Sequence, residues 1–234
     1  MKNLWLLLLM VALPVLGQDQ DEKEPEKKTV AVVDSLYRED QFYFSMAYNL
    51  VQSKPSDYSQ RGFSPTFAFG FLRDMPVNKK RTIAFALGAG YSFTSIKHNL
   101  TVTKTAANET FFDVVSESSF DKNKLELHTV DVPLEIRWRT STPESHKFWR
   151  IYTGFKASYV FASKAVYKAP GVNYKLANID ALNTFQYGAY INAGYNTWNL
   201  YAYYGLSPIF KKGTVAGKDL ELNSLNLGLM FYIL

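Results

Sequence analysis

The sequence predicts an all-β fold: an eight-stranded antiparallel up-and-down transmembrane β-barrel with short periplasmic turns and long extracellular loops. Three observations lead to this prediction. The chain begins with an apolar export segment, eight later stretches alternate bulky apolar residues with small or polar ones, and the connections between these stretches alternate between short and long. The same alternation explains how 16 tyrosines and 17 phenylalanines coexist with a mean hydropathy of only −0.16.

Residues 1–17 are the predicted signal peptide. Met1-Lys2 gives a short positive start, and the apolar run from Leu4 to Leu16 is shorter than the roughly 20 residues that a membrane-spanning helix needs. Val15 and Gly17 suit the −3 and −1 positions of a cleavage site. No later apolar run reaches a helical span, which excludes a helical membrane protein.

The mature chain divides by charge into an arm and a barrel. Residues 18–40 carry eight acidic and four basic side chains and have the composition of a linker, so we expect an acidic periplasmic arm. Residues 41–234, the predicted barrel, carry a net charge of +8. An exported chain without a nucleic-acid-binding motif is not expected to bind nucleic acid, whereas anionic lipid of the outer membrane accounts for the positive sign.

The composition argues against most catalytic and cofactor chemistry. The chain has no cysteine, which excludes disulfides, thiolate metal sites and cysteine nucleophiles. Its three histidines are widely spaced: His98 and His146 are expected to be solvated residues rather than ligands or bases, and His128 lies on the opposite strand face from Asp131, so these two are not a catalytic pair. We therefore expect no enzyme activity, no cofactor and no small-molecule substrate.

Each predicted strand has one bulky apolar face and one small or polar face. Val130, Val132, Leu134, Ile136 and Trp138, opposed to Asp131, Pro133, Glu135, Arg137 and Arg139, show the pattern most clearly. The eight strands are expected at residues 41–50, 63–71, 82–94, 130–139, 149–161, 185–196, 198–207 and 225–233. The short connections fall at 73–80, 140–147 and 196–197, and the longer ones at 52–61, 97–124, 164–183 and 207–219.

Residue size decides which face points inward. A soluble lipocalin-type barrel would have its apolar face inside, but an eight-stranded lumen is narrow and needs small side chains. Eight glycines, including Gly70, Gly90, Gly154 and Gly188, lie on the polar face. The bulky apolar face should therefore contact lipid.

Two candidate sites follow from this orientation. Six charged residues of neighbouring strands should meet in the lumen as a mutually neutralising network that plugs it, with a proton or ion path as the alternative; they are Asp131, Glu135, Arg137, Arg139, Arg150 and Lys156. Apolar residues in the longest loop form the candidate partner surface, unless they extend the barrel above the membrane; they are Phe111, Phe112, Val114 and Val115.

Several stretches resemble the PorT family of outer-membrane β-barrels. The more specific ones are Arg73-Asp74-Met75-Pro76, in the predicted turn after the second strand, and Pro133-Leu134-Glu135-Ile136-Arg137. Weaker matches are Tyr37–Tyr43, Gln60–Ser64 and Gly88–Tyr91. The resemblance covers most of the chain from Tyr37 onward.

The resemblance implies a component of type IX protein secretion, which exports cargo across the outer membrane and supports gliding motility. Other components of that system are then the expected partners, and a plugged barrel would act as a structural or assembly subunit rather than as the conduit. The alternative is a general surface barrel with an adhesion or envelope-integrity role and no secretion partner. Asp34-Ser35-Leu36 also resembles an O-glycosylation pattern, which leaves open whether Ser35 is modified.

Overall fold

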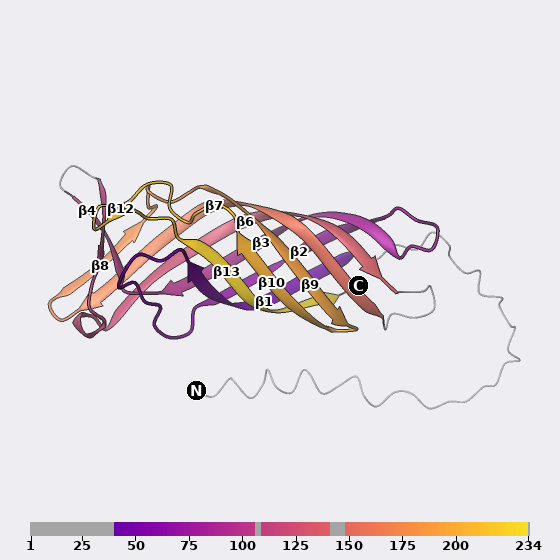
Figure 1. Ribbon diagram of the computed structural model, residues 1–234, viewed down its shortest axis with the longest axis horizontal. Coiled ribbons are helices and arrows are strands. Elements are labelled where there is room, and N and C mark those ends of the chain that lie inside the picture. The colour runs from indigo at the N-terminus through magenta and orange to yellow at the C-terminus, as the bar shows by residue number, and fades with distance from the viewer. Residues whose placement is uncertain (1–39, 106–108, 141–147, 234) are drawn as a thin grey trace, which may run out of the picture. The chain divides into compact units, whose positions relative to one another are not determined.

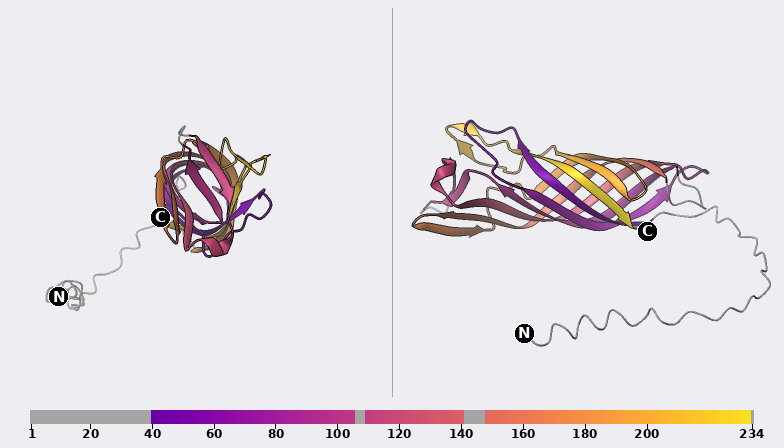
Figure 2. Two further views of the ribbon diagram at one scale, coloured as in Figure 1. Left: turned by 90° about the vertical axis from the view of Figure 1, so that its left-hand side faces the viewer. Right: turned by 90° about the horizontal axis from the view of Figure 1, so that it is seen from below.

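The computed structural model describes residues 40–105, 109–140 and 148–233, and these form a closed antiparallel barrel (Figures 1 and 2). Each barrel strand pairs with the next one in the chain, and pairing of β1 with β13 closes the ring. The eight barrel strands are β1 (Gln41–Gln52), β2 (Pro65–Pro76), β3 (Ile83–Lys97), β6 (Lys122–Arg139), β7 (Trp149–Ala169), β9 (Phe185–Tyr195), β10 (Trp198–Gly205) and β13 (Asn223–Ile233). The predicted fold class is confirmed.

The remaining elements gather at the end of the barrel with the long connections, where Figure 1 shows β4, β8 and β12. They are β4 (Leu100–Lys104), β5 (Thr110–Val114), the 3-10 turn η1 (Glu117–Ser119), β8 (Val172–Ala177), β11 (Thr214–Val215) and β12 (Lys218–Asp219). β4 pairs with β5, β8 extends β7, and β11 pairs with β12. In an outer-membrane barrel this is the extracellular end, and the short turns are periplasmic.

The two faces of the strands have the predicted orientation. Large apolar side chains are exposed on the outer surface, for example Phe69 (56%), Trp149 (61%) and Leu200 (71%), while their neighbours along the strands point into the lumen. In a bilayer this outer surface is solvated by lipid, and closure of the ring leaves no unpaired backbone edge in the hydrocarbon.

Three strands, β2, β6 and β7, extend furthest beyond their predicted bounds. β6 begins at Lys122 rather than at residue 130, and β7 continues to Ala169, because the paired backbone extends beyond the membrane, where polar side chains are solvated. β2 continues through Arg73-Asp74-Met75-Pro76, which we predicted to be a turn. The turn begins only after Pro76, and Asp74 is thereby placed inside the lumen with no solvent exposure.

Two apolar clusters lie inside the barrel wall. The larger lies beneath the extracellular connections and includes Val51, Ile96, Leu125, Phe210 and Leu222. The smaller lies in the lumen and consists largely of tyrosines and alanines, with Tyr43, Tyr190, Tyr201 and Tyr203 among them. The predicted signal peptide, 1–17, and the arm, 18–40, lie outside the described residues except for Asp40.

Candidate functional site

A charge network occupies the periplasmic half of the lumen. The Asp74 carboxylate accepts hydrogen bonds from Arg139 through both of its oxygens, at 2.8 Å each, and from Arg137 at 3.0 Å. Arg137 Nε also donates to Glu135 at 2.7 Å. All four side chains are at most 1% exposed. Adjacent strands β2, β3 and β6 bring them together, because Asp74 pairs with Ala86 and Ala86 with Glu135.

Aromatic rings surround the cationic part of this network. Tyr190 donates to Glu135 at 2.8 Å, and the Arg137 guanidinium lies 4.8 Å from the centre of the Tyr152 ring. The Arg150 guanidinium lies 4.5 Å from the Phe148 ring centre and 5.4 Å from that of Tyr232. Cation–π contacts and shared carboxylates therefore hold three buried arginines together.

A second ion pair lies higher in the lumen. Lys156 Nζ is 3.3 Å from Asp131 Oδ2, and Asp131 also accepts hydrogen bonds from Ser92 and Thr129. Lys156 lines two small cavities, one of about 10 Å³ beside Tyr43 and one of about 40 Å³ walled mainly by hydroxyl groups. A single water needs roughly 10–15 Å³, so these spaces can hold only a few waters. Lys156 is the residue that the linings of the two cavities share.

Glycines make room for the lumen tyrosines. A Cβ atom on Gly90 would lie 2.0 Å from the Tyr43 hydroxyl, and one on Gly188 would lie 2.6 Å from the Tyr203 ring. Both distances are far shorter than any normal contact. These two positions therefore require glycine because a large ring from another strand fills the space above them.

The structure places the six predicted lumen residues on the inner face but in two groups. Glu135, Arg137, Arg139 and Arg150 lie in the lower one, and Asp131 pairs with Lys156 in the upper one. Sequence reasoning missed Asp74, although its alternation with Leu72 and Gly70 on the small face was the signal that could have identified it. Sequence reasoning also did not predict that inward tyrosine rings fill the lumen.

The two described histidines differ from each other. His98 was expected to be solvated, but it is only 3% exposed: its Nδ1 accepts a hydrogen bond from the Leu100 amide, and its ring stacks on Tyr58. Burial lowers the pKa of His98 to about 4 and raises the pKa of Tyr58. His128 faces outward, 2.6 Å from the Tyr91 hydroxyl. His146 lies outside the described residues.

The predicted partner surface is only partly a surface. Phe111 is 56% exposed on the β4–β5 hairpin, but Phe112 is 3% exposed and packs against Phe210 in the cluster beneath the loops. Val114 packs against the same cluster, and Val115 is half-buried. Strand alternation explains the difference, because neighbouring residues of a strand point to opposite faces.

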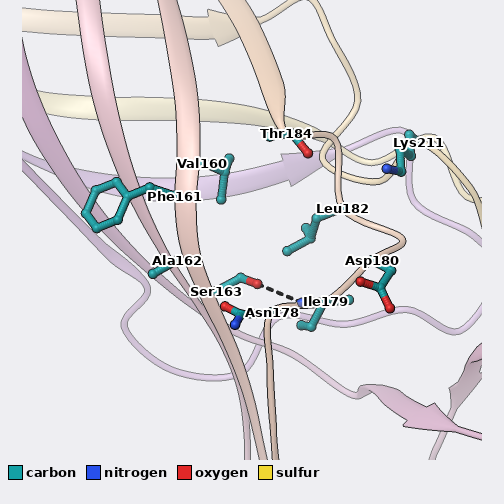
Figure 3. Close-up of a pocket in the computed structure, with 10 residues that line it drawn as sticks. All are labelled: Val160, Phe161, Ala162, Ser163, Asn178, Ile179, Asp180, Leu182, Thr184 and Lys211. Atoms are coloured by element: carbon teal, nitrogen blue, oxygen red, sulfur yellow. Dashed lines mark hydrogen bonds between the residues drawn. The ribbon is translucent and has the colours of Figure 1, made fainter. Parts of the chain in front are cut away.

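A pocket of about 270 Å³ opens at the extracellular rim, where β9 ends its pairing with β7 and β8 takes over (Figure 3). Its floor is fixed by a hydrogen bond of 3.0 Å from the Ile179 amide to Ser163 Oγ. Asp180 and Lys211 both line it, and Asp180 also pairs with Lys104 at 3.0 Å. Mixed charge and partly apolar walls single out no ligand class for this pocket.

Within residues 40–105, 109–140 and 148–233, no three His, Asp or Glu side chains are grouped to hold a metal ion. No helix in the same ranges is long and apolar enough to cross a bilayer.

Comparison with known proteins gives the family. Residues 18–211 match the outer membrane protein beta-barrel domain, and the chain belongs to this family. Solved structures of Ail, the attachment invasion locus protein of Yersinia pestis, are similar in fold, one of them in complex with the heparin analogue sucrose octasulfate. Each is 13% identical and covers 83% of this chain; the shares of Ail covered are 99% and 97%, and the TM-scores are 0.38 and 0.39. No curated protein matches the chain. Membership of this family, together with the closed strand ring, identifies the protein as an outer-membrane β-barrel.

Proposed function

We propose that this barrel is a structural or assembly component of type IX protein secretion and not a conduit or an enzyme. The observation that carries the proposal is the filled lumen. Asp74, Glu135, Arg137 and Arg139 occupy its lower half, and the upper half is capped by an apolar cluster. A cargo protein has no route through a barrel of this width. The barrel would then support export by contacting another component of the secretion system.

The secretion assignment rests on the two sequence stretches that resemble the PorT family. They contact each other in the lumen, because Asp74 of the first stretch binds Arg137 of the second at 3.0 Å. We infer that these two stretches stabilise the barrel. The export role would then belong to surfaces outside the lumen, and the proposed partners are other components of the secretion system.

Two such surfaces are proposed for contact with a partner. Phe111 presents an exposed ring on the extracellular hairpin β4–β5. The acidic arm, 18–40, would act on the periplasmic side, where Gln41 begins β1 near the short turns. The arm can be tested by deleting residues 23–36 while keeping the signal peptide and barrel; unchanged export would dismiss it.

The deciding experiment is deletion of the gene in the native organism, with loss of exported protease, adhesin and surface motility as the readout. We expect loss of export that the wild-type gene restores. Complementation with Phe111→Ser, and with Phe63→Ser as a control for an exposed ring outside the hairpin, then tests the extracellular surface. Normal export in the deletion strain would overturn the proposal.

The second candidate is a surface barrel with an adhesion or envelope-integrity role and no secretion partner. The paired hairpins β4–β5 and β11–β12 and the extended β7–β8 pair favour it, because they build an ordered extracellular surface. The same deletion strain distinguishes the two functions. Detergent sensitivity or lost adhesion with normal export would support this second function.

A further inference from the structure

A basic groove lies on the outer surface of the barrel at its extracellular end, between β3 and β6. It has a volume of about 430 Å³, and four of its nine lining residues are cationic. These are Arg61, Lys97, Lys122 and Lys124. Asp121 also lines it and is the only acidic residue that does so.

Two like-charge pairs border this basic groove. Lys97 lies directly opposite Lys124 in the β3–β6 ladder, and Lys122 lies directly opposite Lys168 in the β6–β7 ladder. Like charges at directly paired positions destabilise a sheet. The two lysine pairs therefore leave a charge repulsion in the sheet that a bound anion would reduce.

The protein itself neutralises only part of this charge. Lys124 binds Glu126, and Arg61 donates to the Glu117 backbone carbonyl. Within the described residues, Lys97 and Lys122 have no carboxylate at ion-pair distance. The groove therefore keeps two lysines available for an anion from outside.

The position of the groove along the membrane normal, relative to the aromatic belt, points to the source of that anion. Four outward aromatic rings lie just below the groove, and each contacts at least one of the others, with ring centres 5.0 to 6.2 Å apart. They are Tyr91, Phe93, His128 and Phe161, and such a cluster is expected of the aromatic belt at a membrane interface. Lys97 is four residues beyond Phe93, which is about 13 Å along a strand and less along the membrane normal because barrel strands tilt. Lysine stems can reach down across that difference to the headgroup level.

We propose that the basic groove binds the phosphate group of an outer-leaflet lipid, with Lys97 and Lys122 as the principal contacts and Lys124 completing the site. A phosphate monoester carries close to two negative charges and three strong acceptor oxygens, and lysine binds it as a point charge. The groove thereby fixes the lipid neighbouring β3 and β6 and stabilises the extracellular end. This inference does not depend on the proposed secretion role.

The test compares the full-length mature protein with Lys97→Gln/Lys122→Gln in nanodiscs of phosphatidylcholine, with or without phosphatidic acid. This pair of substitutions relieves both like-charge pairs and keeps the Lys124–Glu126 bridge. Lys54→Gln/Lys212→Gln is the matched control, because both lysines are exposed in connections at the same end. Bound phosphatidic acid is counted by native mass spectrometry, and the urea midpoint of unfolding is measured in both lipids.

We expect Lys97→Gln/Lys122→Gln to bind phosphatidic acid about tenfold to a hundredfold more weakly, since each charge-assisted contact is worth about one factor of ten and the variant loses two of them. The urea midpoint should change in opposite directions: the variant should be more stable than wild type in pure phosphatidylcholine and less stable with phosphatidic acid. The control pair should leave both readouts unchanged.

Three results would overturn the proposal. The first is equal lipid retention by wild type and variant, and the second is an equal loss of lipid in the control. The third comes from adding inorganic phosphate to the wild type: binding as tight as that of phosphatidic acid would make the groove a site for the free ion rather than for a membrane lipid.

Discussion

Replacing Asp74 by asparagine tests whether the lumen network stabilises the barrel. The substitution keeps the size of the side chain and removes the charge that Arg137 and Arg139 share. Three buried arginines, including Arg150, would then lie near Glu135 as the remaining carboxylate of the lower group.

The magnitude follows from the burial of these groups. Asp74, Arg137 and Arg139 have no solvent exposure, and removing one partner from a buried ion pair costs about 3–5 kcal/mol. Asparagine retains one acceptor oxygen, so we expect a loss of about 3 kcal/mol. With an m-value of about 2 kcal/mol/M, the urea midpoint would fall by about 1.5 M.

Urea unfolding in detergent micelles, followed by tryptophan fluorescence, measures this change. The control is Arg73→Gln, which breaks the exposed Arg73–Asp40 pair one residue away and should cost less than about 1 kcal/mol. Asp74→Asn combined with Arg139→Gln should recover part of the loss, since it removes a buried cation as well. A loss below about 1 kcal/mol for Asp74→Asn would show that the reasoning about the lumen is wrong.

The remaining predictions concern the loop cluster, the glycines and the pore. Between pH 6.5 and 4 the unfolded chain binds a proton at His98 that the folded chain, with its pKa of about 4, does not bind; the stability of this region should therefore fall by about 3 kcal/mol as the pH is lowered through that window. Hydrogen exchange of the Leu100 amide should report this fall, and His98→Gln should abolish the pH dependence. Gly90→Ala should lower the urea midpoint by the equivalent of about 1–3 kcal/mol, and adding Tyr43→Phe should restore part of it because the nearest clashing atom is the Tyr43 hydroxyl. Planar bilayers containing the purified protein should show no porin-like conductance steps, and steady ohmic steps would contradict the filled lumen.

Local alternation explains why the fold was accessible from sequence. Trp138, Ile136 and Leu134 lie on one face and Arg139, Arg137 and Glu135 on the other, whatever the rest of the chain does, because successive side chains of a strand point in opposite directions. Asp74 was misassigned because Pro76 and the polar neighbours of Asp74 look like a turn. The ladder between β2 and β3 nevertheless pairs Asp74 with Ala86 and Pro76 with Ala84.

The same limit applies to the extracellular end. His98 was expected to be solvated and Phe112 to be exposed, but both are buried beneath connections that come from other parts of the sequence. No periodicity within residues 97–124 records which distant segment covers them. The basic groove is a comparable case, because Lys97 lies opposite Lys124 only through the register of β3 with β6.

The sequence by itself therefore determined the number of barrel strands, the lipid-facing side and six of the charges inside, since each depends on residues close together in the chain. Only the tertiary structure decided how those charges pair: Asp74 binds both Arg137 and Arg139, and Lys156 binds Asp131 and lines two cavities. It also decided which rim residues are covered and which lysines share a groove. The physical reason is that register and closure bring together side chains from strands far apart in sequence, and a one-residue shift in register would exchange every inner side chain for an outer one.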